Sequence, residues 1–171
     1  MLRKLLFLSI SCLIAVSPLA AQASHLGMNP VQKIDGATNP ELIPDSTAYR
    51  LFFVVVGLGN SPSDQDRIRQ ATNIAKIRLN DADAKTLTAA VNDFKASYDA
   101  AIQTHNSTAD TLQKNGQVPD VSAFLAQRDV LVEATRNKLS SSLTADGSSR
   151  LNAYIQAEKH GMKIVRAVST N

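Results

Sequence analysis

The chain has 171 residues, with 18 lysine and arginine side chains against 15 aspartate and glutamate side chains, one cysteine and no tryptophan. This length is enough for one domain with a hydrophobic core. The formal net charge of +3 is too small to indicate a general nucleic-acid binder, which would carry a strong basic excess.

Residues 1–23 have the pattern of a secretory signal peptide. Arg3 and Lys4 form a basic start, residues 5–19 form an apolar run, and a small-residue exit ends at Ala23. The apolar run is shorter than the ~20 residues that a membrane-spanning helix needs. We therefore expect cleavage after Ala23, a periplasmic or secreted product, and no stable membrane insertion.

Removal of this segment changes the charge and redox arguments. Arg3 and Lys4 leave and no acid does, so 16 basic side chains face 15 acidic ones and the net charge falls to about +1. The only cysteine, Cys12, also leaves, so the mature chain has no disulfide despite its oxidising destination. Packing must therefore provide its stability.

The mature chain is predicted to begin with a flexible leader over residues 24–42. This stretch is polar, contains Pro30, Gly36 and Pro40, and shows no hydrophobic period. A single helical domain over residues 43–167 is expected to follow.

The most apolar mature stretch, residues 51–58, permits two interpretations. Three consecutive valines, residues 54–56, are typical of a buried strand. No second strand-like segment is expected to pair with it, so a short buried helix is favoured. Asp45 or Ser46 is expected to cap that helix.

A second helix is expected after the glycine- and proline-containing break at residues 57–62. Ser63 is placed to cap it, and Asp66 is placed to complete a capping box. Its expected inner side carries Ile68, Ala71, then Ile74 or Ala75, and then Arg78 or Leu79.

The longest predicted helix runs from Ala82 to Lys114, roughly 50 Å at about 1.5 Å per residue. Apolar or semi-polar residues recur along it at steps of three and four, which makes a stripe down one side. The stripe consists of Leu87, Val91, Phe94, Tyr98, Ala101, His105, Ala109 and Leu112. Partner helices must cover this length. The weak helix formers of residues 104–108 predict a bend or frayed section.

Two further helices are predicted after the break at residues 116–119. The first is expected to be capped by Asp120 and to run to about Ser142. The second is expected to start within residues 144–148 and to carry its apolar side as far as Val165. The fold class is therefore all-α, a helical hairpin or bundle of about five helices with one long central helix.

Two of the predicted helix starts look alike. One begins Leu79-Asn80 and the other Leu143-Thr144, and each continues with an acidic first turn and a leucine eight positions after the first. Asn80 or Thr144 can accept a hydrogen bond from an unpaired amide of the first turn. Acidic residues there are stabilised by the positive end of the helix dipole.

This arrangement resembles the Spy/CpxP family of periplasmic stress proteins, whose signature Leu-Thr-x-x-Gln is present twice. Asp83 and Gly147 stand here at the two glutamine positions. The resemblance also covers the signal peptide, the mature length and the helical content. It implies a helical hairpin protein that dimerises into a curved cradle and holds unfolded clients without ATP. Some relatives bind metal or restrain a sensor kinase.

The sequence predicts no catalytic, cofactor or metal site. Its only histidines are His25, His105 and His160, and Glu158 lies two positions before His160, where two residues of a helix do not share a side. Surface or packing histidines are therefore expected. The mature chain has no cysteine nucleophile, and the sequence has no Gly-x-Ser-x-Gly elbow and no glycine-rich phosphate loop.

The side chains predicted for an interaction surface come from two sources. Three belong to the long stripe, and three belong to a mild basic excess in the C-terminal helices that could steer acidic partners. They are Phe94, Tyr98, His105, Arg128, Arg136 and Lys138. We expect an exported binding protein, an ATP-independent periplasmic chaperone or envelope-stress adaptor, that binds protein clients or envelope proteins and forms a homodimer.

Two alternatives remain open. The first is a small exported enzyme with an acid/base site near His105. The second is a structural envelope module that docks a partner through residues 51–58.

Overall fold

The computed structural model describes residues 31–167, so the predicted signal peptide lies outside the described residues. The chain divides into two compact units. Residues 34–164 form one unit, which contains all the described helices. Of the other unit, residues 31–33 and 165–167 are described, and they are the outer ends of two strands.

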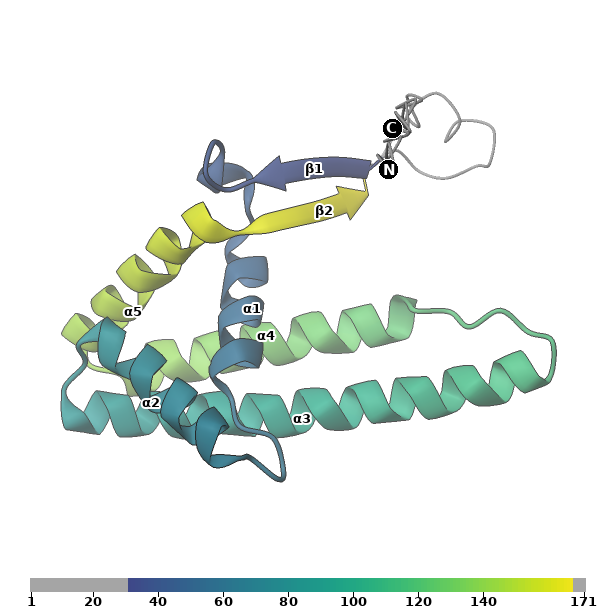
Figure 1. The fold of residues 1–171 in the computed structure, drawn as a ribbon, viewed down its shortest axis with the longest axis horizontal. Helices are drawn as coiled ribbons and strands as arrows, with labels where there is room; N and C mark the ends of the chain where they lie inside the picture. Colours follow the sequence, from purple (N-terminus) through teal and green to yellow (C-terminus); the bar gives the residue numbers. More distant parts are fainter. Residues whose placement is uncertain (1–30, 168–171) are drawn as a thin grey trace, which may run out of the picture. The chain divides into compact units, whose positions relative to one another are not determined.

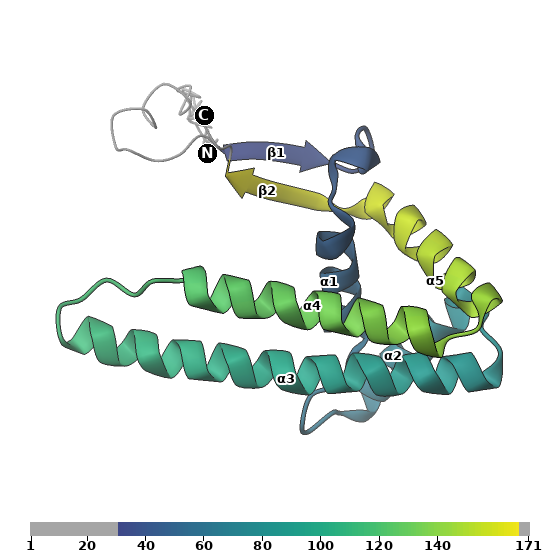
Figure 2. The ribbon, with the colours of Figure 1, turned by 180° about the vertical axis from the view of Figure 1, so that it is seen from behind.

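Within the described residues, five α-helices form the helical unit (Figures 1 and 2). They are α1 (Asp45–Val56), α2 (Asp64–Ile77), α3 (Asp81–Lys114), α4 (Ser122–Ser142) and α5 (Ala145–Glu158). Two short 3₁₀ turns flank them, η3 (Pro40–Leu42) and η4 (Lys159–Gly161). The predicted all-α class with one long central helix is confirmed. No helix in this part of the chain is both long and apolar enough to cross a lipid bilayer.

The long helix α3 is continuous over 34 residues, so the weak helix formers of residues 104–108 do not interrupt it. α4 packs along it, and this tertiary packing outweighs local propensity. The predicted phase of the stripe is confirmed. Its first part is buried, at Leu87, Val91, Phe94 and Ala101, and its remaining members, at Tyr98, His105, Ala109 and Leu112, are partly exposed.

Residues 51–56 belong to the helix α1 and not to a strand, as the sequence favoured. α1 supplies three aromatic core side chains, Tyr49, Phe52 and Phe53, and the fully buried ring of Phe53 lies 5.1 Å from the ring of Phe94. The predicted cap is wrong by one residue. Pro44 occupies the cap position without a side-chain bond, while the Asp45 carboxylate accepts a hydrogen bond from the Lys159 ammonium.

The structure differs from the sequence predictions at both ends of its described part. β1 (Val31–Asp35) lies in the predicted flexible leader, and β2 (Lys163–Ala167) replaces the predicted last turns of α5. The two pair in a two-stranded sheet, although no second strand was expected. Each is a five-residue segment whose partner lies near the other end of the chain, so neither gives a strong local pattern.

The turn after β1 is fixed by a close backbone approach. The Gly36 N–H donates to the Met162 carbonyl at 2.8 Å. A side chain at Gly36 would overlap the carbonyl oxygen of Lys159, so only glycine fits there. The part of the predicted leader nearest the helices is thus packed against η4.

Candidate functional site

The two look-alike helix starts meet in space, which no sequence pattern indicated. The Asn80 side chain caps α3, and Thr144 Oγ1 caps α5 by accepting from the Gly147 N–H at 3.0 Å. The Asp83 carboxylate, 3% exposed, accepts from the backbone N–H of Thr144 at 3.0 Å and from its hydroxyl. These bonds, with that from the Asn80 amide, lower the pKa of Asp83 below its usual value.

This arrangement gives a structural reason for Asp83 and Gly147, which stand at the same position of the two look-alike helix starts. Asp83 joins the N-termini of α3 and α5 into one capped unit. A Cβ at Gly147 would overlap Asp83 Oδ2, so glycine permits the approach. The two positions serve packing between helices within this chain.

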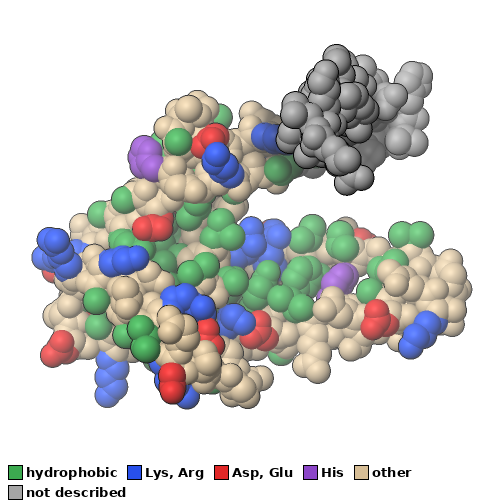
Figure 3. Space-filling view, viewed as in Figure 1, with side chains coloured by type: hydrophobic (Ala, Val, Ile, Leu, Met, Phe, Trp, Pro, Cys, Tyr) green, Lys and Arg blue, Asp and Glu red, His purple; other side chains and the backbone are tan. Residues whose placement is uncertain are grey.

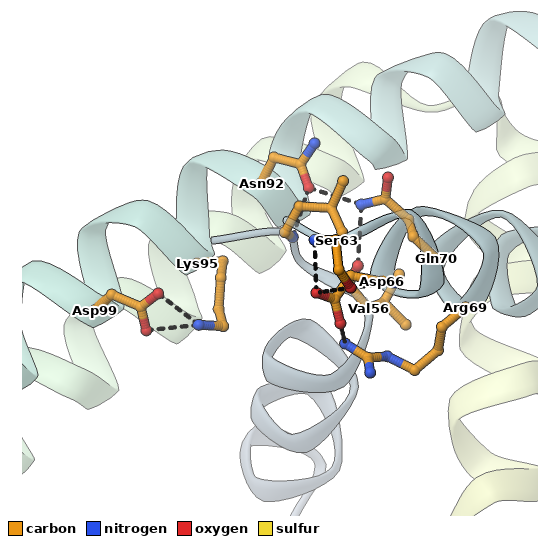
Figure 4. Close-up of polar contacts among 9 residues, drawn as sticks. Val56, Ser63, Asp66, Arg69, Gln70, Asn92, Lys95 and Asp99 are labelled. Atoms are coloured by element: carbon orange, nitrogen blue, oxygen red, sulfur yellow. Dashed lines mark hydrogen bonds and ion pairs between the residues drawn. The ribbon is translucent and has the colours of Figure 1, made fainter. Parts of the chain in front are cut away.

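A buried polar link fixes α2 against α1 and α3 (Figure 4). The Gln70 side-chain amide donates to the Val56 carbonyl at 3.0 Å and to Asn92 Oδ1 at 2.7 Å. Asn92 Oδ1 also accepts from the Leu58 N–H at 2.9 Å. The carbonyl at the end of α1 is thereby satisfied.

The same link explains an error in the predicted inner side of α2. Its buried residues are Gln70, Ile74 and Ile77, whereas Ile68 is 58% exposed and Ala71 is also exposed. Because Gln70 is polar, a search for recurring apolar residues does not identify it as a buried position, and the predicted buried side of α2 is therefore wrong. The predicted capping box of Ser63 and Asp66 is confirmed.

The proximal half of α3 is therefore covered from several sides, and its distal half is not. A Cβ at Gly57 would overlap Val91 and Lys95 of α3, and a Cβ at Gly59 would lie 3.4 Å from Asp99 Oδ2, so the chain after α1 runs close to this part of α3. Figures 1 and 2 agree that α3 and α4 continue beyond α1 and α2 as a two-helix hairpin. We call residues 102–130, the outer part of this hairpin, the distal arm. We call the rest of the helical unit the hub.

The distal arm carries exposed apolar side chains near its turn, in the segment that joins α3 to α4 and in the first turn of α4. The exposed fractions are 92% for Val118, 50% for Val121 and 38% for Leu125, and Leu112, near the end of α3, is half-buried. We call these four residues the apolar tip. Hydrophobic side chains also gather along the hairpin in the space-filling view (Figure 3). Apolar groups grouped in this way are typical of interaction sites.

An aromatic row connects the core to the distal arm. The Phe94 ring stacks on Tyr98 at 5.5 Å, Tyr98 lies 6.2 Å from Phe124, and Phe124 stacks on His105 at 5.0 Å. Phe94 is a core residue and is 2% exposed, whereas Tyr98, His105 and Phe124 are partly exposed. The row thus contains three residues of the predicted interaction surface, Phe94, Tyr98 and His105. Of these, Phe94 is buried and is not a surface residue.

The predicted basic residues are individually paired with acids. Arg128 contacts Asp129 at 2.7 Å, and Lys138 contacts Asp93 on α3 at 2.8 Å. Arg136 contacts Glu133 at 2.8 Å. Further pairs hold Arg150 with Asp146, Lys159 with Asp45 and Lys163 with Asp35. This pairing offsets the positive charge that the sequence suggested for the C-terminal helices.

His105 lies on the distal arm, where its ring stacks on Phe124. Within residues 31–167 no carboxylate forms an ion pair or hydrogen bond with it, and none of the main cavities is lined by it. This geometry gives the acid/base hypothesis no support. In the same part of the chain, no three His, Cys, Asp or Glu side chains converge as metal ligands would. His25 lies outside it.

No family model matches the chain, and no curated protein or solved structure is significantly similar to it. The resemblance to the Spy/CpxP family therefore stays a prediction.

Proposed function

We propose that the protein is an exported helical binding protein that holds apolar segments of incompletely folded proteins without ATP, as a periplasmic chaperone or envelope-stress adaptor. The observation that carries this proposal is the apolar tip of the distal arm. Val118 and Val121 are at least half exposed there, on the two-helix hairpin that continues beyond α1 and α2 (Figure 1).

The chemistry of the distal arm suits weak and unselective binding. Burial of apolar surface contributes about 25 cal/mol per Å² and has no directional requirement, so clients of different sequence can satisfy it. Arg128, one of the two lysine and arginine side chains of the distal arm, is already paired with Asp129. Client binding should therefore depend little on ionic strength, in contrast to a site that attracts acidic partners.

Light scattering of an aggregating client, with and without the mature chain, tests the proposal. We expect suppression by the wild type and loss of most of it when Val118, Val121 and Leu125 are all replaced by serine. These residues are exposed, so the variant should keep its fold, as circular dichroism can check.

Ile68→Ser is the control, because Ile68 is an apolar residue of the hub whose exposure, 58%, lies within the range of the three replaced residues. It should leave the suppression unchanged. Absence of suppression by the wild type at equimolar protein would refute the chaperone proposal. Equal loss in both variants would show that the effect does not belong to the distal arm.

The expected homodimer would draw on the same apolar surface. Sedimentation of the wild type and the triple serine variant over a range of concentrations shows whether the apolar tip serves dimerisation or client binding. A dimer that the triple variant abolishes, together with no client protection, would assign the apolar tip to self-association.

The remaining alternative, docking through residues 51–58, has less support. Phe52, Phe53 and Val56 are buried within the helical unit, and Val55 is the large apolar residue of α1 that is more than half exposed. A partner could reach Val55 and the partly exposed Leu51, Val54 and Leu58, but not the three buried side chains.

A further inference from the structure

A second kind of site lies in the hub, away from the distal arm. A cavity of about 300 Å³, partly open to solvent, is formed by residues of α1, α4 and α5 and the link between the last two. Such a volume is at the lower end of the range for small-molecule sites. Its polar lining consists of Tyr49, Glu133, Arg136, Asn137, Ser140, Ser148 and Asn152. Three leucines, Leu139, Leu143 and Leu151, supply an apolar wall.

Arg136 is held in place but is not saturated. Its Nη1 donates to Glu133 Oε1 at 2.8 Å, and its Cζ lies 4.8 Å from the centre of the Tyr49 ring. A guanidinium carries five N–H donors in a rigid fork, and within the described residues one hydrogen-bond contact uses them. The other donors are available to a carboxylate, which a guanidinium can bind through two parallel bonds.

Tyr49 adds a neutral donor to the same wall. Nine-tenths of the residue is buried, yet no hydrogen bond joins its hydroxyl to another residue of the described part. Every fully buried side-chain nitrogen or oxygen in that part has a partner. The Tyr49 hydroxyl must therefore reach solvent, and Tyr49 lines this cavity. Burial raises the pKa of Tyr49 above its ordinary value, so the hydroxyl keeps its proton at neutral pH.

Glu133 supplies the opposite charge. Its Oε1 accepts from Arg136, and its other carboxylate oxygen has no hydrogen-bond partner within residues 31–167. The charges of Glu133 and Arg136 thus offset each other at this cavity, and each side chain keeps unused hydrogen-bonding capacity. A simple anion would meet the repulsion of Glu133, and a simple cation would meet that of Arg136.

We propose that this cavity binds a small zwitterion of the α-amino-acid class. The ligand's carboxylate lies against the free N–H groups of Arg136 and the Tyr49 hydroxyl, and its ammonium lies against the free oxygen of Glu133. Its side chain contacts the leucine wall. The volume equals that of about ten water molecules at ~30 Å³ each, which is room for a small amino acid. This proposal is independent of the function proposed for the distal arm.

Isothermal titration calorimetry of the purified mature chain with L-serine, L-asparagine and L-leucine tests the proposal. We expect at least one of them to bind with a Kd of about 1 mM or tighter. Arg136→Gln should weaken that binding by about tenfold or more, since a charge-assisted bond is lost. Tyr49→Phe keeps the ring under Arg136 and should weaken it by a smaller factor, about threefold to tenfold.

Arg128→Gln is the matched control. Arg128 is also an α4 arginine paired with a neighbouring acid, but it does not line the cavity, so binding should be unchanged. Propionate and ethylamine, each carrying one of the two charges, should bind at least about tenfold more weakly than the amino acid. Saturable binding by none of the three amino acids, unchanged binding in Arg136→Gln, or equal affinity for propionate would overturn the proposal.

Discussion

The hub and the distal arm are built on the same two helices, α3 and α4, but differ in what covers them. In the hub, Phe94 of α3 packs against Phe53 of α1, and its side chain is 2% exposed. In the distal arm, His105 of α3 meets Phe124 of α4, and both remain partly exposed. The hydrophobic stripe of α3 passes through both regions without a change of period.

The comparison shows that a stripe predicts which side of a helix faces a partner, but not how many partners it has. In the distal arm, α4 alone packs on the stripe of α3 and leaves it partly exposed. In the hub, α1 packs on the stripe as well, and most of the stripe is buried. Because most helical stability in proteins comes from packing, we infer that the distal arm opens locally at lower free energy than the hub. A binding surface on the less stable region can adapt to different clients.

The largest expected effect is a difference between two phenylalanines. Phe94→Ala should lower the free energy of unfolding by about 3–5 kcal/mol, because it leaves a cavity among buried rings. Phe124→Ala should cost less, about 1–2 kcal/mol, because Phe124 is already partly exposed. Urea melts followed by circular dichroism measure both values.

Lys85→Ala serves as the control for these melts, since Lys85 is exposed and lies off the stripe. It should change the free energy of unfolding by no more than about 0.5 kcal/mol. Equal costs for the two phenylalanine variants would show that the hub and the distal arm do not differ in packing, and the comparison would fail.

A medium effect is expected where α3 and α5 begin. Gly147→Ala should cost about 1–3 kcal/mol, because the added methyl group overlaps Asp83 Oδ2 and separates the two helix caps. Gly161→Ala should change the free energy of unfolding by no more than about 0.5 kcal/mol, since nothing lies within 4 Å of a Cβ there. Thermal and urea melts of the two alanine variants measure both changes in the free energy of unfolding. A neutral Gly147→Ala would mean that the Asp83 bonds do not constrain the hub.

The smallest effect expected is a dependence of hub stability on pH. Hydrogen bonds from the Lys159 ammonium and then the Gln156 amide lower the pKa of Asp45 in the folded state. A lowered folded pKa means that folding favours the ionised carboxylate. Its contribution is present above the unfolded value of about 3.9 and is lost as the pH falls through the lower folded value. Asp45 is partly exposed, so the contribution should be about 1 kcal/mol or less.

Urea melts at pH 7 and pH 3 of the wild type and Asp45→Asn measure this contribution. The variant should lose less stability between the two pH values than the wild type. Asp110→Asn is the control, because Asp110 is an exposed residue of the distal arm, and it should follow the wild type. Identical pH dependence in the wild type and Asp45→Asn would remove the Asp45–Lys159 pair as a source of acid sensitivity.

The sequence by itself determined the elements whose signals are local. The period of α3, the capping box of Ser63 and Asp66, and the caps at Asn80 and Thr144 each depend on residues within a few turns of one helix, and all were predictable. The helical state of residues 51–56 also followed, although it required the argument that a strand would lack a partner. The same argument failed for the two short strands, which do find each other.

Only the tertiary structure decided which of these elements meet. The contact of Asp83 with Thr144 spans 61 residues, and that of Asp45 with Lys159 spans 114, so neither pair leaves a trace in local spacing. The cavity around Arg136 likewise draws its walls from three helices, and the exposed apolar tip results from helices that end before they reach it. Hydrophobic periodicity predicts which side of a helix faces the core. Burial and site geometry depend on contacts with segments far away in the chain, and the local sequence does not predict those contacts.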